Sequence, residues 1–320
     1  MQQIPYTNTR PFDMRILITG ANGFIGQYCV AAFSKAGWQV RAISRQLLLE
    51  RPGVEVMRFP LDPMSTDWTT LFRGVNCILH LAGVAHRPTA VLSEYEKINV
   101  QLTRVIAEAA TACGVERFVY LSSIAVHGRK RSEINETMPV CPDDANGRSK
   151  ALAEAALHKI AHNGSMHWSI VRSPLVYGPN APGNFRRLAA LVRRGIPLPL
   201  LAATEPRSYI GIDNLVSALL CVTSNPKAAD KVYLVSDNDD ICTADLVRAL
   251  ASGVGRPARL WWLPPRLLRL GASMLGRSDD AQRLLERLQI NTRVIREELE
   301  WTPLISAHEG IARAMAEKNN

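Results

Sequence analysis

Three glycines give this sequence its clearest chemical signal. Gly20, Gly23 and Gly26 stand in TGANGFIG, between the apolar run RILITG at 15–20 and a helical pattern over 23–37. Glycines let a turn close tightly around a pyrophosphate, and the N–H groups of the following helix N-terminus face that anion. With a strand before it and a helix after it, this turn predicts a dinucleotide-binding site.

The end of the second predicted strand, over 38–45, bears on which dinucleotide binds. No carboxylate stands at 42–45 to bond a ribose 2′-hydroxyl, as is usual for NAD. Arg45 could instead pair with a 2′-phosphate, and Ser44 could add a hydroxyl contact. We therefore expect NADP(H) to be preferred, with NAD(H) as the other candidate. The alternative for Arg45 is a plain surface cation.

Short apolar runs alternate with helical patterns through the first half of the chain. Strands are predicted at 15–20, 38–45, 54–62, 77–83, 117–123 and 167–173, and the main helices at 23–37, 95–114 and 147–162. Continuous apolar strands separated by helices indicate an α/β fold with a doubly wound parallel sheet, covered on both faces.

After residue 174 the alternation of strands and helices becomes irregular, which predicts a second structural unit. We expect a dinucleotide-binding (Rossmann) domain over 14–173, which the chain rejoins at 209–237. A smaller, discontinuous C-terminal substrate domain is expected from 174–208 and 238–320.

Composition narrows the class of protein. The chain has 320 residues, 47% of them apolar, and a net charge of +9. Six cysteines form no CxxC pair, so we expect no metal site. Aromatic residues are few and no long Lys/Arg block occurs, which argues against a nucleic-acid partner. Without an apolar run of spanning length or a signal-peptide pattern, the chain is expected to be cytoplasmic.

The motifs together resemble one enzyme family. The GxxGxxG turn, HLAG at 80–83, LSS at 121–123 and NGRSK at 146–150 are similar to the extended short-chain dehydrogenase/reductases, in the branch of nucleotide-sugar epimerases, dehydratases and 4-reductases. RSYIGIDN at 207–214 and LEWTP at 299–303 match C-terminal signatures of that branch. Beyond the three glycines, the resemblance implies cofactor contacts from Phe24, Ile25, Asp62, Leu81, Ala82, Gly83, Asn99, Lys150, Pro174 and Val176.

The same resemblance assigns catalytic roles. In the family a Ser or Thr, a Tyr and a Lys act together, and the Tyr exchanges a proton with the sugar oxygen. Ser123 takes the hydroxyl role, with Ser122 second, and Lys150 the ammonium role. The Tyr position is Asn146, an amide that cannot act as an acid or base near pH 7. Since losing a general acid costs about 10²–10⁴ in rate, we expect an inactive or substrate-trapping protein.

Three explanations compete for Asn146. An engineered change fits the otherwise intact motifs best. Natural loss of catalysis would leave a cofactor-binding regulator. A substitute donor, His127 or His86, is the third, because histidine titrates near neutral pH, although a structural histidine is more frequent at 127.

The resemblance also suggests the substrate. It implies UDP-sugar contacts from His86, Ser123, Asn184, Leu198, Arg207 and Tyr209. The expected reaction is NADPH-dependent reduction of the C4 ketone of a UDP-linked 4-keto-6-deoxy-hexosamine, for bacterial surface polysaccharide such as lipopolysaccharide O-antigen. The alternatives are a UDP-hexose 4-epimerase with tightly bound NAD, and a non-catalytic NADP-binding regulator.

Two surface features bear on partners. RPARLWWLPPRLLRLGASMLGR, at 256–277, is apolar, aromatic and cationic without an acidic residue. It predicts either peripheral contact with the inner face of a membrane or core packing of the C-terminal domain. The helices at 95–113 and 147–162 match those that pair in family dimers, so we expect a homodimer.

Overall fold

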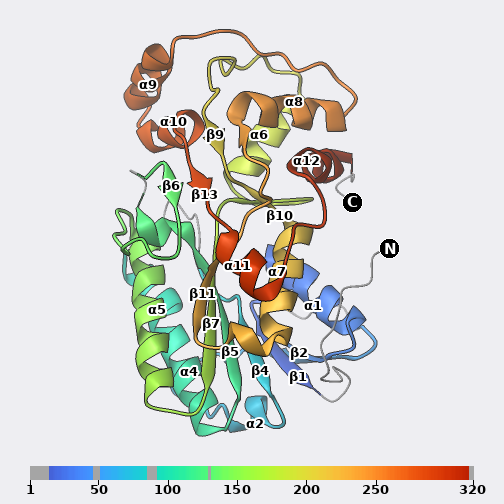
Figure 1. Cartoon of the computed structure of the whole chain (residues 1–320), viewed down its shortest axis with the longest axis vertical. Coiled ribbons are helices and arrows are strands. Elements are labelled where there is room, and N and C mark those ends of the chain that lie inside the picture. The colour runs from blue at the N-terminus through green and yellow to red at the C-terminus, as the bar shows by residue number, and fades with distance from the viewer. Residues whose placement is uncertain (1–13, 46–50, 85–91, 129–130, 317–320) are drawn as a thin grey trace.

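Seven parallel strands form the central sheet of the protein (Figure 1). The structure is a computed structural model that describes residues 14–45, 51–84, 92–128 and 131–316. The strand order is β11-β7-β5-β4-β1-β2-β3. The strands are β1 (Arg15–Thr19), β2 (Gln39–Ser44), β3 (Val54–Arg58), β4 (Cys77–His80), β5 (Arg117–Ser123), β7 (His167–Ser173) and β11 (Lys231–Leu234). The order reverses between β1 and β4, and ligands of such sheets bind outside the carboxyl ends at this switch point.

Helices cover both faces of the sheet, as the doubly wound pattern predicts (Figure 1). On one face lie α1 (Phe24–Lys35), α7 (Ile212–Ser224) and α11 (Arg293–Leu299), and on the other α2 (Thr69–Phe72), α4 (Leu102–Ala112) and α5 (Ala145–His162). Side chains alternate along each strand: Ile16 and Ile18 join the first core, and Leu17 joins the second. This alternation lets strands that are apolar throughout bury both of their faces.

Two predicted elements differ from those observed. The helix expected over 95–114 is instead α3 (Leu92–Tyr95), a π-helical segment η2 (Glu96–Gln101) and then α4. Such π-helical turns occur often at functional sites, and η2 carries Asn99. The third strand ends at Arg58 rather than at Asp62, because Pro60 has no N–H to give to a sheet.

The second half of the chain builds a smaller unit above the sheet in Figure 1. Its helices are α6 (Asn184–Arg193), α8 (Thr243–Gly253), α9 (Pro265–Met274), α10 (Ser278–Leu285) and α12 (Ala307–Ala316). The short strands pair two by two: β8 (Val176–Tyr177) with β10 (Ile210–Gly211), β9 (Pro206–Arg207) with β12 (Ile241–Cys242), and β6 (Glu133–Ile134) with β13 (Gln289–Ile290). Short 3₁₀ turns are η3 (Ile124–His127) and η4 (Pro226–Ala228).

The domain boundaries remain a prediction, although β11 does lie in the main sheet beside β7. Within the described part of the chain, no helix is both long enough and apolar enough to cross a bilayer.

A pair of glycine substitutions tests how tightly the first turn is packed. A Cβ on Gly26 would lie 2.2 Å from the Gly20 carbonyl oxygen, a backbone atom that cannot move aside cheaply. We expect Gly26→Ala to lower the free energy of unfolding by about 1–3 kcal/mol, measured in urea. The control, Gly271→Ala in α9, meets open space. It should raise the same free energy by about 0.5–1 kcal/mol. Equal effects would contradict the packing described.

Candidate active site

The turn between β1 and α1 carries glycines where backbone segments approach each other closely. Gly20 has a φ of +67°, and a Cβ there would lie 2.8 Å from the backbone N of Ala82. Gly23 is the N-cap of α1, and no side chain caps the helix. The turn therefore fits the pyrophosphate of a dinucleotide, which would accept from the free backbone N–H groups. Those groups belong to the predicted cofactor residues Phe24, Ile25 and Gly26.

A buried threonine joins this turn to the end of β4. The Thr19 hydroxyl oxygen accepts from the backbone N–H groups of Leu81 and Ala82, each at 3.2 Å, and lies 2.8 Å from His80 Nδ1. The Thr19 hydroxyl can therefore donate its own proton to Nδ1 of a neutral His80. Burial, and then the Lys150 ammonium, lower the pKa of His80 to about 3, which keeps the ring neutral. Sequence analysis missed Thr19 and His80, because their contact joins residues 61 positions apart.

Asn99 fixes the loop that follows β4. Its Oδ1 accepts from the Val84 N–H at 2.7 Å, and its Nδ2 donates to the Val84 carbonyl at 3.0 Å and to Ser149 Oγ at 2.8 Å. A Cβ on Gly83 would lie 3.1 Å from Asn99 Oδ1. Asn99 therefore joins the loop of Leu81–Gly83 to helix α5, and any direct contact with a cofactor stays a prediction.

The adenosine end of the predicted site has fewer built contacts. Ser44 is buried at the end of β2, and Arg45 follows it as an exposed residue. Asp62 accepts from the Met64 N–H at 3.1 Å and from Ser65 Oγ at 2.6 Å. The Ser65 hydrogen bond, first among several, holds the pKa of Asp62 below its ordinary value. Asp62 thus forms its hydrogen bonds within its own loop, and its contact with the cofactor stays a prediction.

Lys150 and Ser123 share the carboxyl end of β5. Lys150 Nζ donates to the Leu121 carbonyl at 2.9 Å. Burial lowers the pKa of this ammonium to about 8, and the nearby Glu154 carboxylate opposes that shift. Ser123, two residues beyond Leu121, is half-buried, and its Oγ accepts from the Ala125 N–H at 3.2 Å. A hydroxyl and a cation therefore stand at the sheet edge that also carries the glycine turn.

Asn146 lies in the first turn of α5, one turn before Lys150. The helix is capped by Asp144, whose carboxylate accepts from the Gly147 N–H at 2.6 Å. The Asn146 backbone carbonyl accepts from Ser149 Oγ at 2.8 Å. Its side-chain Oδ1 is buried and has no hydrogen-bond donor among the described residues. Leaving such an acceptor without a donor costs about 1–3 kcal/mol, so the site favours a ligand that donates to it.

Behind these groups lies a buried chain of polar side chains. Ser122 Oγ donates to Glu154 Oε1 at 2.5 Å. Arg172 donates to both carboxylate oxygens of Glu154, from Nε at 3.1 Å and from Nη2 at 2.6 Å. Both side chains of this ion pair are 6% exposed. Ser122 is thus committed to the interior, which leaves Ser123 as the better placed of the two predicted hydroxyls.

The same chain of contacts corrects one idea about a substitute proton donor. Arg172 Nη1 donates to His127 Nε2 at 3.0 Å, and His127 Nδ1 lies 3.4 Å from the Pro139 carbonyl. Because a guanidinium only donates, His127 is neutral with its proton on Nδ1. Burial, followed by the Arg172 charge, lowers the pKa of His127. His127 therefore has a structural place in the interior. His86, the other candidate donor and a predicted substrate contact, lies outside the described residues.

The predicted substrate residues lie mostly in the smaller unit. Leu198 and Tyr209 are 7% and 6% exposed and pack in its core, and their contact with a substrate stays a prediction. Arg207 donates to the Glu286 carbonyl, and burial lowers its pKa. The remaining predicted contacts are Asn184, which starts α6, Pro174, buried directly after β7, and Val176, half-buried in β8.

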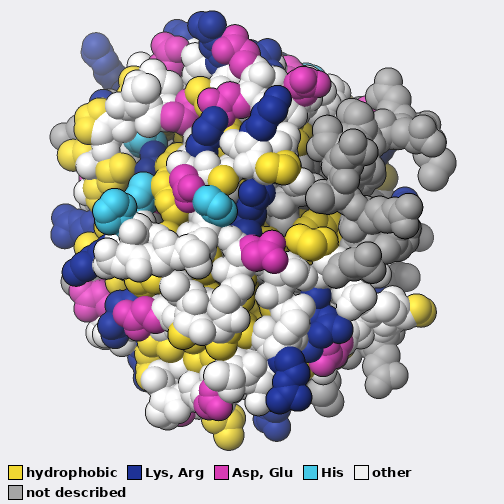
Figure 2. All heavy atoms as spheres, turned by 60° about the horizontal axis from the view of Figure 1, so that its bottom comes forward, with side chains coloured by type: hydrophobic (Ala, Val, Ile, Leu, Met, Phe, Trp, Pro, Cys, Tyr) yellow, Lys and Arg dark blue, Asp and Glu magenta, His cyan; other side chains and the backbone are white. Residues whose placement is uncertain are grey.

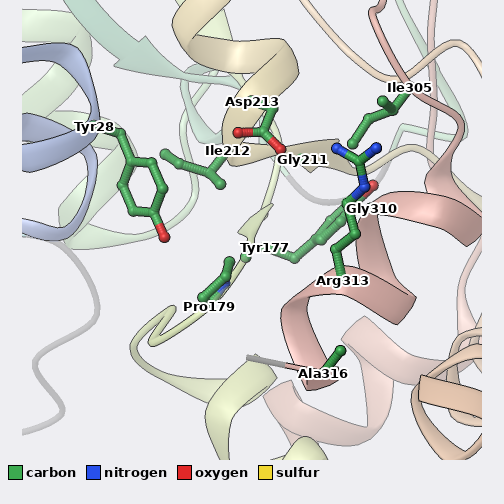
Figure 3. A pocket seen from close by; sticks show the side chains of 11 residues that line it. Tyr28, Tyr177, Pro179, Gly211, Ile212, Asp213, Ile305, Gly310, Arg313 and Ala316 are labelled. Carbon is green, nitrogen blue, oxygen red and sulfur yellow. The ribbon is translucent and has the colours of Figure 1, made fainter. Parts of the chain in front are cut away.

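A pocket of about 420 Å³ opens on the α1 and α7 face of the sheet (Figure 3). Tyr28 of α1 lies on one side of it, and Arg313 and Ala316 of α12 on the other. Tyr177 and Asp213 also line it. None of the residues predicted from sequence lines this pocket.

Comparison with known proteins identifies the family. Residues 16–236 match the model of the NAD dependent epimerase/dehydratase family, and the chain belongs to that family. A UDP-glucose 4-epimerase of Vibrio cholerae is 33% identical over 332 residues, which cover 98% of this chain and 99% of that protein.

Two solved structures share the fold. The UDP-glucuronic acid 4-epimerase from Bacillus cereus in complex with NAD has a TM-score of 0.79 and 20% identity, covering 94% of this chain and 95% of its own. MoeE5 in complex with UDP-glucose and NAD has a TM-score of 0.77 and 23% identity, covering 94% of this chain and 97% of its own. The fold expected from the sequence is thereby confirmed, and so is the epimerase/dehydratase family.

Removing one partner of the buried ion pair tests its role. Glu154→Gln would leave the Arg172 guanidinium buried without a carboxylate, and we expect it to lower the free energy of unfolding by about 3–5 kcal/mol. The matched control is Glu108→Gln, which breaks the exposed pair with Arg104. That change should cost less than about 1 kcal/mol in the same urea titration. A Glu154 variant no weaker than the control would contradict the buried pair.

Proposed function

We propose that this chain binds a nicotinamide dinucleotide and a UDP-hexose, in a site of the UDP-hexose 4-epimerase type. The observation that carries the proposal is the buried Lys150 ammonium, bound to the Leu121 carbonyl two residues before Ser123, at the sheet edge that also carries the glycine turn. Similarity to a UDP-glucose 4-epimerase over 98% of the chain supports the sugar class. A bound nicotinamide supplies the capacity to take up and return a hydride, and the chain's own residues supply binding and orientation.

Each residue has a limited role in this proposal. The Ser123 hydroxyl orients the C4 oxygen of the sugar. The Lys150 ammonium holds the nicotinamide ribose of the dinucleotide. The buried Asn146 Oδ1, which has no donor among the described residues, accepts from a sugar hydroxyl. A carboxamide binds in this way but takes up no proton near pH 7. This chain, with Asn146, is therefore proposed to bind its substrate well and to turn it over slowly.

Restoring a phenol at position 146 tests this proposal. Asn146→Tyr should raise the rate of UDP-glucose and UDP-galactose interconversion by about 10²–10⁴, the usual contribution of a general acid–base. The dissociation constant for UDP, measured by calorimetry, should stay within a few-fold of the unchanged chain. Asn146→Phe is the control, since it adds the ring without the hydroxyl and should gain no rate. An unchanged chain already as fast as the Tyr variant would contradict a missing donor.

An NADPH-dependent reductase of a UDP-linked 4-keto-6-deoxy-hexosamine is the second candidate. It is favoured by exposed Arg45 after β2 and by the lack of a carboxylate at 42–45. The preference for NADP(H) stays part of this candidate, as does a role in surface polysaccharide synthesis.

The cofactor that purifies with the chain separates the candidates. Mass spectrometry of the denatured protein should find retained NAD if the epimerase proposal holds. NADPH in its place would overturn that proposal in favour of the reductase. A non-catalytic regulator predicts a third pattern: the dinucleotide binds, and calorimetry detects no binding of UDP.

Assembly and location also remain proposals. The helices α4 and α5, which lie side by side on one face of the sheet (Figure 1), are the proposed homodimer contact, and Leu152 of α5 is exposed there. A cytoplasmic location is proposed, with peripheral contact to the inner face of the membrane.

A further inference from the structure

One exposed segment of the smaller unit is unusually apolar. Residues 256–277, here called the α9 surface, run up to and through helix α9 at the far end of that unit (Figure 1). Trp262 is 64% exposed, Met274 79% and Leu275 76%. The other large apolar side chains exposed along it are Trp261, Leu267 and Leu270. Isolated exposed apolar residues are normal, but a group of this kind within one short segment indicates an interaction surface.

The helix geometry collects part of this surface on one face. Leu267, Leu270 and Met274 are spaced three and four residues apart, so they lie on the same face of α9. Leu268 points to the protein and packs against the core of the smaller unit. No residue of α9 is fully buried. The helix therefore has one side for its own domain and a second apolar side with no covering element among the described residues.

The charges of this segment have one sign. Arg256, Arg259, Arg266, Arg269 and Arg277 are all exposed, and no acidic residue occurs from 256 to 277. Acidic residues resume in the sequence only at 279 and 280. The face of the molecule shown in Figure 2 is different, because Lys and Arg side chains there are interspersed with Asp and Glu. Arg256 and Arg259 donate to the carbonyls of Arg193 and Gly195. The α9 surface thus joins exposed apolar groups to five arginines with no acidic residue in the segment.

We propose that the α9 surface docks on an anionic lipid bilayer. The apolar face of α9 and the two tryptophans enter the boundary between headgroups and acyl chains, while the arginines pair with lipid phosphates. A second copy of the chain fits less well, because a two-fold contact through this surface would bring five arginines against five. The proposal goes beyond the proposed function, since docking requires neither the dinucleotide nor the UDP-hexose.

Vesicle sedimentation of the full chain tests the docking. The chain should sediment with vesicles of phosphatidylcholine and phosphatidylglycerol, and stay in the supernatant with phosphatidylcholine alone. High salt should weaken the binding, because it screens the arginine charges. Leu267→Glu with Leu270→Glu should lower the partition coefficient at least about tenfold, and Arg266→Ala with Arg269→Ala by roughly the same factor.

Controls keep the test specific. Leu304→Glu replaces an apolar residue of similar exposure (58%) outside the α9 surface, and should sediment like the unchanged chain. All variants should bind UDP in solution alike, so a failure of docking is distinguishable from a failure of the proposed function. No sedimentation with the anionic vesicles would overturn the proposal, as would equal losses in the Leu304 and α9 variants. A dimer that dissociates on Leu267→Glu with Leu270→Glu, without lipid, would assign the surface to a second copy instead.

Discussion

The close approach of two backbone segments, the turn after β1 and the loop after β4, is the constraint on which the site depends. A Cβ on Gly20 would meet the backbone of Ala82 at 2.8 Å, so the turn can carry no side chain at this position. The Thr19 hydroxyl joins the two segments by accepting from the first N–H groups of the β4 loop. Because the sheet order reverses between these two strands, the same approach opens the crevice in which ligands of such sheets bind.

Burial of charge shapes the opposite side of that crevice. Burial removes water from the Lys150 ammonium and so lowers its pKa. The ammonium donates to the Leu121 carbonyl, and its Nζ lies 4.7 Å from the centroid of the Tyr120 ring. One turn further along α5, Glu154 is buried with two hydrogen bonds from Arg172. Buried pairs of this kind add little net stability over apolar packing, but breaking one is costly. The pair therefore constrains how α5 meets β7, and with it the position of Lys150.

Two features set this chain apart from the simplest expectation for its family. Asn146 places a carboxamide one turn before the buried lysine, and its buried Oδ1 has no donor in the part of the chain that the structure describes. This is the basis of the proposal that the site binds its substrate but turns it over slowly. The α9 surface adds a cationic, apolar face on the side of the helix away from Leu268, which packs on the core. The proposed binding in the crevice and the proposed contact at α9 involve different residues.

The sequence by itself determined the doubly wound sheet, the glycine turn and the spacing of Ser123, Asn146 and Lys150, because these follow from local patterns of a few residues. It also raised two alternatives for the segment over 256–277 that composition could not separate. Only the tertiary structure decided that Leu267 and Leu270 are exposed while Leu268 packs on the core. It also decided that His127 is bound to Arg172 and that Thr19 meets His80. Each of these depends on contacts between residues far apart in the chain, or on what covers a helix face. Local periodicity predicts which side chains share a face of a helix or strand. It does not predict which other part of the chain, if any, packs against that face.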